Sequence, residues 1–533
     1  MPAISLSLRG IALVVGVSIA CLASAAPPSD LDARVEAVIR EHGVPGMAVA
    51  IVEKGQVVHA KGYGVRKLGA TDRVDADTVF PTGSTGKAVT TAALAILVDQ
   101  KKIGWDDKVI DHLPGFQMYD PWVTREMTIR DLLVHRSGLG LGAGDLLFVP
   151  RSSLSRAESV RRLRYIKPAT SFRSGYAYDN ILYMVAGQLI EQVSGQTWEA
   201  FVRDQIFKPA GMSVSTADDK DHFATANRVH PHARMDGGFR GIGTQEVLDE
   251  RAILGRNAAP AGGLSSSAND MGRWLAIQLA HGALPGTNGK RLFSEEASRE
   301  MWTPQVLMPI TQYPAPIAEA TPQFSSYALG WDVEDYRGVK ILTHGGAVFG
   351  VQTLVVLIPD RQVGFSLQIN SEDGVVLRGL GNELLDHYLG APKRDWVADF
   401  ASFKKGRVAQ AQLALASVRH KTSVSKPSLA LPAYAGRYND PWYGPMDINH
   451  QGGRLRIDFK QTPNMAGNLE HFQYDTFVAR WDDRTIEPAY VTFALDAKGG
   501  IERITMKPYS PLADFSYDYQ DLLFTPQAVN GGQ

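Results

Sequence analysis

The distribution of strand-like segments along the 533-residue chain limits its fold more than any other feature. Near the start, residues 47–53 and 56–63 predict a hairpin about Lys54-Gly55. The middle of the chain, roughly residues 85–300, instead shows apolar spacing of helical period, broken by Gly, Pro and Ser loops. Strand character returns at 327–333, 339–343, 353–358 and 363–369, and a helix is predicted over 375–388. Strands at both ends predict one sheet built from distant segments, with a helical lobe inserted and a cleft between the lobes.

A second boundary in composition follows residue 418. Residues 419–431 carry Ser, Lys and Pro without periodicity, which predicts a linker. Residues 432–533 are rich in aromatic residues and in short predicted strands, such as those on either side of the turn at 451–453. This pattern is typical of a small all-β barrel or sandwich. A chain of this length is too long for one ordinary core, so 27–418 is predicted to be a separate first domain.

The first 26 residues have the pattern of a secretory signal peptide. Arg9 precedes an apolar run over 11–22, and small residues at 23–25 follow, with cleavage expected after Ala25 or Ala26. The run is too short to span a bilayer, and no later segment has the character of a transmembrane helix. We therefore expect a periplasmic or secreted protein.

Cys21, which lies inside this predicted signal peptide, is the single cysteine of the chain. The exported protein is therefore expected to have no disulfide, no cysteine nucleophile and no thiolate metal site. A lipid anchor on Cys21 stays open, although Ser18 occupies a position where lipoprotein signals prefer leucine.

The charge and the histidines point to no macromolecular partner and no cofactor. The formal net charge is −1, which gives no reason to expect nucleic acid or an acidic membrane surface as a partner. His230-Pro231-His232 offers two imidazoles, but no further Asp, Glu or His stands at ligand spacing, so we expect a solvent-facing loop rather than a metal site. No cofactor is predicted, and the sequence leaves a homo-oligomer open.

The segment Gly83-Ser84-Thr85-Gly86-Lys87 carries the first chemical signal. It does not fit a phosphate-binding loop, because Ala88 stands where that loop needs Ser or Thr and Pro81 has no N–H at the first glycine position. The apolar spacing that follows places Ser84 near a helix start, with Lys87 on the same face. An amine there can take or steer the proton of a serine nucleophile. The alternative is a helix-capping serine beside a solvated lysine.

Two further segments can supply the partners of such a serine. Tyr178-Asp179-Asn180 precedes a predicted helix, so the phenol can project into the cleft. His344-Gly345-Gly346-Ala347 ends a predicted strand, and its glycines let a substrate backbone approach closely. For His344 the alternative is a buried strand-end histidine bonded to backbone.

S-x-x-K, Y-x-N and H-x-G, in this order, resemble the motifs of the serine hydrolases related to class C β-lactamases and D-alanyl-D-alanine peptidases. The resemblance covers roughly residues 31–390 and implies their α/β (α+β) fold, with an antiparallel sheet lobe and a helical lobe. Secondary signatures also match, namely LLVHRSGL at 132–139, PAGGLSSSANDMGRWL at 260–275 and YALGW at 327–331. His135, in the first of these, is expected to pack or bond within its own helix and loop.

The C-terminal segment resembles the lipocalin-like β-domain that is appended to some of these hydrolases. The resemblance rests on YAGRY at 434–438, DPWYGP at 440–445 and LEHFQYDTFVARW at 469–481. It leaves the role of this domain open.

The resemblance also implies roles for single residues. Ser84 is then the acylated nucleophile, and Lys87 and Tyr178 share the duty of general base. Asn180 holds the substrate amide and the amine of Lys87. His344 and Gly346 contribute to substrate binding, and the backbone N–H groups of Ser84 and Ala347 form the oxyanion hole.

The implied reaction is hydrolysis of amide bonds in small peptides, with a D-residue at the scissile bond. The resemblance extends to bacterial peptidases that open linearised microcystin at a D-Ala–Leu bond. A carboxylesterase or β-lactamase with the same residues, and a non-catalytic penicillin-binding sensor, are the alternatives. His344 stands where many relatives have the lysine of K-T-G. Unperturbed histidine gains a charge only near pH 6.5, so we expect weak or no β-lactam turnover.

Overall fold

The computed structural model of the chain describes residues 26–237, 240–421 and 425–527. Cys21 and nearly all of the predicted signal peptide lie outside the described residues. Within these three ranges, no helix is both long enough and apolar enough to cross a bilayer.

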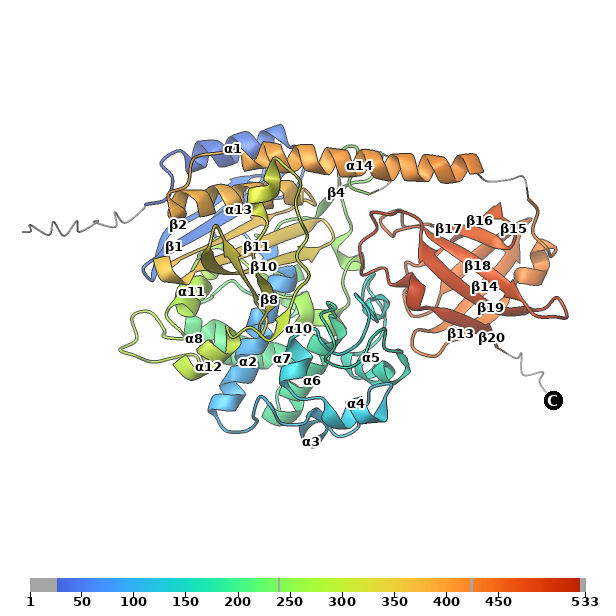
Figure 1. The fold of residues 1–533 in the computed structure, drawn as a ribbon, viewed down its shortest axis with the longest axis horizontal. Coiled ribbons are helices and arrows are strands. Elements are labelled where there is room, and N and C mark those ends of the chain that lie inside the picture. The colour runs from blue at the N-terminus through green and yellow to red at the C-terminus, as the bar shows by residue number, and fades with distance from the viewer. Residues whose placement is uncertain (1–25, 238–239, 422–424, 528–533) are drawn as a thin grey trace, which may run out of the picture.

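The first domain is built on one antiparallel sheet of eight strands, in the order β2-β1-β12-β11-β10-β9-β8-β7. The strands are β1 (Gly46–Glu53), β2 (Gln56–Gly64), β7 (Val306–Leu307), β8 (Ser325–Tyr327), β9 (Asp332–Tyr336), β10 (Val339–Val348), β11 (Val351–Ile358) and β12 (Val363–Ile369). β1 pairs with β12, with Val49 opposite Leu367, so segments from the two ends of the domain lie side by side (Figure 1). This confirms the predicted sheet built from distant segments.

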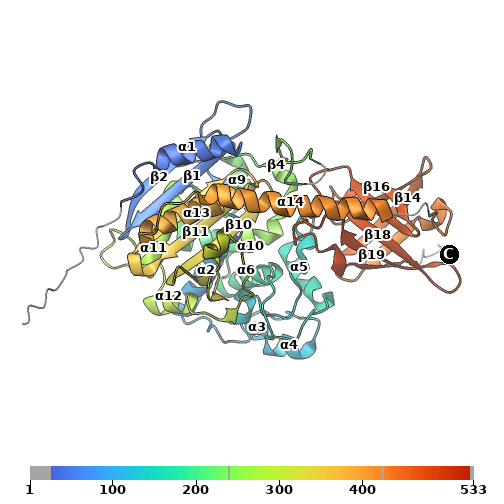
Figure 2. The ribbon, with the colours of Figure 1, turned by 45° about the horizontal axis from the view of Figure 1, so that its top comes forward.

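Both faces of the sheet are covered, and β1 shows why. Its alternate residues Met47, Val49 and Ile51 belong to one apolar cluster, while Ala48 and Ala50 belong to another on the opposite face. The first cluster is closed by helices α1 (Leu31–Glu41), α13 (Gly374–Leu389) and α14 (Trp396–Lys421), which lie along the outer face in Figure 2. The other face carries the helical lobe.

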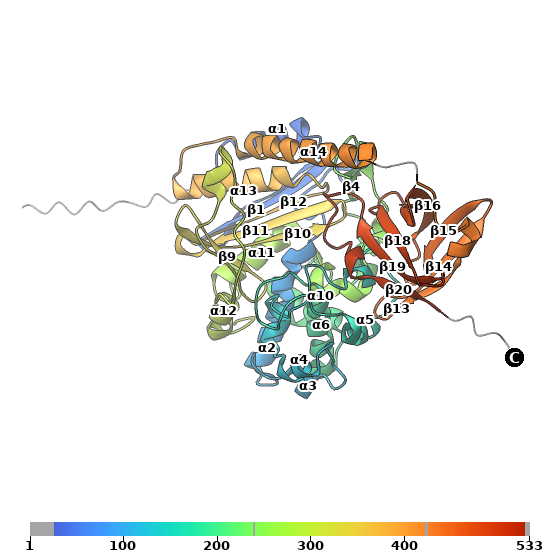
Figure 3. The same ribbon diagram turned by 45° about the vertical axis from the view of Figure 1, so that its right-hand side comes forward.

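The helical lobe surrounds helix α2 (Lys87–Asp99), which is buried over most of its length. Its residues from Lys87 to Leu97 are all buried, and small Ala and Thr side chains let neighbouring helices approach closely. The other helices, most of which lie below the sheet in Figure 3, are α3 (Val109–His112), α4 (Pro121–Glu126), α5 (Arg156–Arg162), α6 (Ile181–Ser194), α7 (Trp198–Val202), α8 (Lys208–Ala210), α9 (Asp219–Ala224), α10 (Ala259–Gly262), α11 (Ala268–Leu279) and α12 (Glu295–Met301). Short two-stranded sheets pair β3 (Phe80–Pro81) with β6 (Ser265–Ser266) and β4 (His232–Arg234) with β5 (Gln245–Val247).

Two local predictions differ from the structure. The predicted strand over 327–333 is interrupted between β8 and β9, where Gly330 has a φ of +83° that favours glycine. The N–H of Ala328 donates to the carbonyl of Trp331 across this turn, at 2.8 Å. The predicted helix start at Ser84 is instead a 3-10 turn, η1 (Gly83–Gly86), after which α2 begins at Lys87.

The C-terminal segment forms a closed all-β barrel of eight strands, as predicted for this part of the chain. The strands are β13 (Gly436–Asp440), β14 (Gly444–Gln451), β15 (Arg454–Phe459), β16 (Ala466–Gln473), β17 (Thr476–Trp481), β18 (Ala489–Leu495), β19 (Ile501–Pro508) and β20 (Leu523–Pro526). In β15 the buried residues Leu455, Ile457 and Phe459 alternate with polar ones, the period expected of a strand with one buried face. Aromatic side chains fill the interior in edge-to-face contacts, including those of Phe459 with Trp481 and with Phe524.

Helix α14 leads from the first domain to the barrel and was not predicted. It has 26 residues, about 39 Å at 1.5 Å per residue. Its apolar residues do not gather on one face, so periodicity did not reveal it. The predicted linker at 419–431 therefore begins inside this helix. It also ends against the barrel, because the N–H and hydroxyl of Ser428 both donate to the carboxylate of Asp475.

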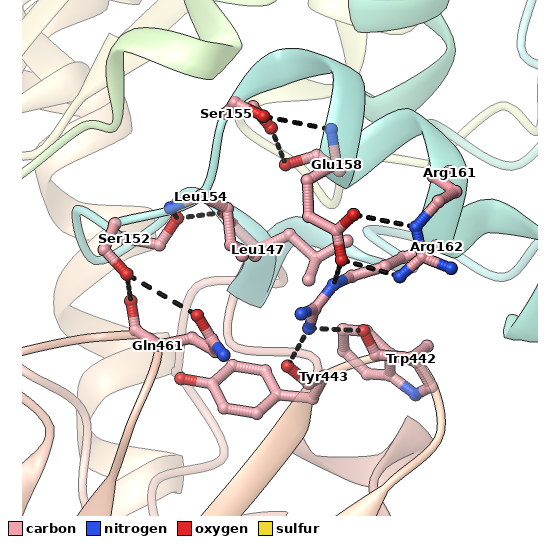
Figure 4. Close-up of polar contacts among 12 residues, drawn as sticks. Leu147, Ser152, Leu154, Ser155, Glu158, Arg161, Arg162, Trp442, Tyr443 and Gln461 are labelled. Atoms are coloured by element: carbon pink, nitrogen blue, oxygen red, sulfur yellow. Dashed lines mark hydrogen bonds and ion pairs between the residues drawn. The ribbon is translucent and has the colours of Figure 1, made fainter.

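The barrel docks against the helical lobe through polar contacts to its backbone (Figure 4). Arg162 of α5 pairs with Glu158 at 2.8 Å and donates to the carbonyl oxygens of Trp442, at 3.1 Å, and Tyr443. The N–H of Ser153 donates to the carbonyl of Gln461 at 2.9 Å. The two domains therefore share an interface beyond their covalent connection.

The contact between β10 and η1 gives a test of the fold. A Cβ added at Gly346 would lie 2.1 Å from the carbonyl oxygen of Thr82, whereas a Cβ at Gly345 would meet nothing within 4 Å. We expect Gly346→Ala to lower the free energy of unfolding by about 1–3 kcal/mol, because β10 must move away from η1. Gly345→Ala should stay close to the wild type. Chemical denaturation of both variants measures the difference, and equal values would contradict the described packing.

Candidate active site

Ser84 lies in η1, between the end of β10 and α10, and faces a cavity. This cavity has a volume of about 1180 Å³, and Ser84, Tyr178, Asn180 and His344 all line it. The structure thus brings together four residues from three segments that lie far apart in the sequence. Ser84 itself is half-buried, which leaves its hydroxyl accessible from the cavity.

Lys87 is fully buried beneath Ser84, with 0 % of its surface exposed. This excludes the alternative of a solvated lysine. Its Nζ lies 3.0 Å from Ser84 Oγ, 2.7 Å from Asn180 Oδ1 and 2.7 Å from the carbonyl oxygen of Ala261. The amine therefore has three oxygen neighbours, and of these atoms only the hydroxyl of Ser84 can both donate and accept.

Burial decides the charge of this amine. It lowers the pKa of Lys87 to about 7, while the carboxyl groups of Asp145 and Asp179 act in the opposite direction. A large fraction of the amine is then neutral at neutral pH. Asn180 and Ala261 accept the two N–H bonds of a neutral amine, which leaves its lone pair for the hydroxyl of Ser84.

Tyr178 lies immediately before α6, with its ring close to the same amine. Nζ of Lys87 is 4.8 Å from the centre of the ring. The phenol is buried and forms no hydrogen bond of normal geometry with the described residues. Burial raises the pKa of Tyr178 well above its usual value, an effect that the neighbouring Ser84 hydroxyl reduces. The phenol is therefore protonated at neutral pH and suited to donate a proton.

Residues without a predicted catalytic role hold Tyr178 in place. His135 stacks obliquely on the phenol ring, with ring centres 4.2 Å apart, and its Nδ1 accepts the N–H of Asp179 at 3.1 Å. The hydroxyl of Ser137 donates to Asp179 Oδ2 at 2.7 Å. The expectation that His135 bonds only within its own helix and loop is wrong, because it packs against the Tyr178 loop. The LLVHRSGL motif marked this residue, but nothing in the sequence showed its contact.

His344 lines the cavity as a neutral side chain. Tyr327 OH lies 2.8 Å from Nε2, and Nδ1 lies 2.7 Å from the carbonyl oxygen of Gly345. With Nδ1–H donating to that carbonyl, Nε2 accepts the phenol proton. Burial lowers the pKa of His344 to about 3, and Lys87 adds to this effect. The prediction that His344 ends a strand is wrong, because β10 continues to Val348. The bond to the Gly345 carbonyl is the one expected for the alternative, a buried histidine bonded to backbone, although the residue also lines the cavity.

The end of β10 offers a free edge to the cavity. Its pairing with β9 ends where Thr343 faces Asp332, and residues 344–348 pair only with β11 among the described strands. Gly345 and Ala347 are exposed there. The backbone of Ala347 approaches η1 so closely that a Cβ on Gly83 would lie 2.5 Å from its N atom. This close approach brings the backbones of Ala347 and Ser84 to the same end of the cavity.

The remaining cavity wall contains carboxyl groups and barrel residues that the sequence did not indicate. Asp332 and Glu334 of β9 line it, and burial raises the pKa of Asp332 well above its usual value and that of Glu334 to about 7. Phe515 and Ser516 line it from the loop between β19 and β20. The C-terminal barrel therefore contributes directly to the cavity.

His232 differs from the sequence-based expectation of a solvent-facing loop. It is fully buried, its Nε2 accepts the N–H of Leu68 at 3.0 Å, and its Nδ1 lies 2.9 Å from the carbonyl oxygen of Asn370. Both ring nitrogens form hydrogen bonds with backbone groups, which gives this residue a structural role. Across the three described ranges, His, Cys, Asp and Glu side chains form no group of three or more that could hold a metal ion.

Comparisons with known proteins agree with this architecture. The profile of the family described as Beta-lactamase matches residues 31–389, and that of a domain of unknown function (DUF3471) matches residues 420–526. Over 502 residues the chain is 28% identical to Unguisins hydrolase ungD of Aspergillus violaceofuscus (strain CBS 115571). That alignment covers 88% of this chain and 86% of the fungal protein.

Two solved structures share the fold. The octameric penicillin-binding protein homologue from Pyrococcus abyssi superposes with a TM-score of 0.55 at 18% identity, covering 93% of this chain and 99% of that one. The D-amino acid amidase from Ochrobactrum anthropi SV3, complexed with L-phenylalanine amide, superposes with a TM-score of 0.52 at 20% identity. This superposition covers 68% of this chain and 98% of the amidase chain. At these identities the likeness concerns the fold.

The lowered pKa of Lys87 predicts how stability depends on pH. Between about pH 7 and 10.5 the unfolded chain binds a proton at this lysine that the folded chain does not, so raising the pH stabilises the fold. Lys87→Met removes this contribution. We expect the wild-type free energy of unfolding, relative to Lys87→Met, to rise by up to about 1.4 kcal/mol per pH unit between about pH 8 and 10.

Denaturant titrations at three pH values in this range measure the effect. Lys102→Met, at an exposed lysine, is the matched control and should show no such trend. A difference between wild type and Lys87→Met that stays constant with pH would contradict the neutral amine.

Proposed function

The chain belongs to the β-lactamase family, and on this basis we propose that it is a serine hydrolase that cleaves amide bonds of small peptides through an acyl-enzyme at Ser84. The observation that carries the proposal is the buried amine of Lys87, 3.0 Å from Ser84 Oγ, whose pKa of about 7 suits a general base. A module that only binds ligands has no need of such an amine.

The geometry supports a complete acylation step. Ser84 Oγ attacks the substrate carbonyl carbon, and its proton passes to the neutral amine of Lys87. When the tetrahedral intermediate collapses, the carbon–nitrogen bond breaks and the leaving amine takes a proton from Tyr178, which regains one from Lys87. Water then attacks the ester carbonyl carbon and gives a proton to Lys87. The bond between this carbon and Ser84 Oγ breaks, Lys87 returns the proton to Oγ, and the acid is released. The backbone N–H groups of Ser84 and Ala347 are the proposed donors to the oxyanion.

The free edge of β10 supports a peptide as the substrate. An extended chain can add to residues 344–348 as a further strand, held by main-chain hydrogen bonds. Asn180, next to Lys87, can also meet the substrate amide. Within this class we propose peptides with a D-residue at the scissile bond, such as linearised microcystin with its D-Ala–Leu bond. Neutral His344 supplies no cation for a carboxylate, which argues against efficient β-lactam turnover.

We also propose that the protein is exported, on the pattern of residues 1–26. Export places the hydrolase where peptides from outside the cell can reach it. The intact mass of protein recovered from the periplasm or the medium tests this proposal, because removal of residues 1–25 or 1–26 changes the mass by a known amount.

Covalent labelling tests the nucleophile. Diisopropyl fluorophosphate should add one phosphoryl group per chain, at Ser84, and the rate should rise with pH around an apparent pKa of about 7, because neutral Lys87 is the base. Ser84→Ala should gain no mass. Equal labelling of wild type and Ser84→Ala would remove Ser84 from the reaction.

Substrates with different leaving groups test Tyr178. With a peptide containing a D-Ala–Leu bond, Tyr178→Phe should lower kcat by a factor of about 10² to 10⁴, the usual effect of losing a proton-transfer group. With a p-nitrophenyl ester, whose leaving group needs no proton, the loss should be much smaller. An equal loss on both substrates would contradict proton donation by Tyr178. Turnover of a cephalosporin faster than of the peptide would instead favour a β-lactamase.

A further inference from the structure

Asp145 is a buried carboxyl group that the proposed reaction does not use. It lies at the start of a 3-10 turn, η3 (Asp145–Leu147), and has no exposed surface. Its Oδ2 accepts two hydrogen bonds, from Asn180 Nδ2 at 2.9 Å and from the hydroxyl of Ser516 at 2.8 Å. Asn180 in turn accepts from Lys87. A continuous chain of hydrogen bonds therefore joins the C-terminal barrel to the amine beside Ser84.

The barrel loop that carries Ser516 also bonds to the residues on either side of Asp145 in the sequence. The carboxylate of Asp518 accepts the N–H of Gly144 at 2.6 Å and that of Leu146 at 3.2 Å. Phe515 packs edge-on against the ring of Tyr178, with ring centres 5.8 Å apart. The loop thus contacts the Tyr178 ring directly and is connected to the Lys87 amine through Asp145 and Asn180.

The hydrogen bonds on either side of Asn180 fix the orientation of its side-chain amide. The side chain of Asn180 can offer either its carbonyl or its NH₂ group to Lys87. Burial raises the pKa of Asp145 to about 8, and the hydrogen bonds from Asn180 and Ser516 act in the opposite direction. Asp145 Oδ2 accepts both of these bonds. Asp145 therefore takes the NH₂ group, and the carbonyl must face Lys87. That carbonyl occupies one N–H of the neutral amine, so the lone pair is left for Ser84. Ser516, as a donor to the same oxygen, holds Asp145 in its place.

We propose that Asp145 and Ser516 are positioning residues that set the orientation and reactivity of Lys87 through Asn180, so that the barrel is a working part of the active site. This inference deepens the proposed serine hydrolase function and rests on it. Asp145 is not among the residues that line the cavity, whereas Ser516 is. Both act on Lys87 through the hydrogen bonds described above.

The charges around this chain give the direction of the expected changes. Lys87 faces the carboxyl groups of Asp145 and Asp179, the rings of Tyr178 and Tyr183, and the imidazoles of His135 and His344. Asp145 faces Lys87 and the carboxyl groups of Asp514 and Asp518. Because Asp145 raises the pKa of Lys87, its removal should lower that pKa. Loss of Ser516 should act in the same direction, since its hydrogen bond favours the ionised form of Asp145.

The test is the pH profile of labelling by diisopropyl fluorophosphate. Its fluoride leaving group needs no proton, so the rate reports the Ser84–Lys87 pair rather than Tyr178. Asp145→Asn should lower the limiting rate by about 10- to 100-fold, the effect of losing a hydrogen bond to a charged group. It should also move the acid limb to lower pH by about one unit. Ser516→Ala should give smaller changes in the same directions.

Two further variants separate positioning from stability. Ser516→Thr keeps the hydroxyl and should restore the wild-type limb and most of the rate. Ser153→Ala removes a hydroxyl that contacts Gln461 elsewhere on the same interface and should leave the profile unchanged. If Asp145→Asn does not fold, the comparison of Ser516→Ala with Ser516→Thr tests the proposal alone. A Ser516→Ala profile that matches the wild type, or one that loses rate and melting temperature without moving its limb, overturns the inference. Failure of the wild type to label at any pH overturns the proposed function itself.

Discussion

The burial of one amine is the constraint on which the rest of the site depends. Lys87 has no exposed surface, so its polar atoms must find partners inside the protein. Asn180 and Ala261 supply two of them from separate segments of the helical lobe, and Ser84 supplies the third. A dry environment also shifts the amine toward its neutral form, which can accept a proton. The same desolvation keeps Tyr178 protonated and His344 uncharged, so one physical cause assigns three protonation states.

These states refine the division of roles between lysine and tyrosine. The resemblance implied that the two share the duty of general base. Burial disfavours the charged form of both groups. Both are uncharged when Lys87 is a neutral amine and Tyr178 keeps its proton. The wall formed by His344, Asp332 and Glu334 then offers no positive charge to a substrate. Other residues of the cavity lining are basic, namely Arg240, Arg378, Lys404 and Arg407. Under the proposed function, main-chain hydrogen bonds along β10 add to the recognition of a peptide.

Sequence patterns predicted the parts of the molecule that depend on local chemistry. The alternation in β1 and β15, the turn glycines between strands and the order of three motifs were enough for the sheet, the barrel and the residues that meet around Ser84. Contacts made over long distances were not readable. Ser516 and Asp145 lie 371 positions apart, and neither belongs to a motif. His135 and Tyr327 stood inside recognised motifs, yet only the folded chain shows what they touch. Helix α14 lacks an apolar face, so its length gave no periodic signal.

The distance between Asp145 and Ser516 has a consequence for how the enzyme matures. At a synthesis rate of about 5–20 residues per second, Ser516 leaves the ribosome roughly 20 to 75 s after Asp145. During that interval the nascent hydrolase domain contains its serine, lysine and tyrosine, but the carboxyl group of Asp145 still lacks its hydroxyl partner. Translation itself therefore delays the completed chain of hydrogen bonds, and an unfinished polypeptide carries Ser84 and Lys87 before it carries the hydroxyl that bonds to Asp145.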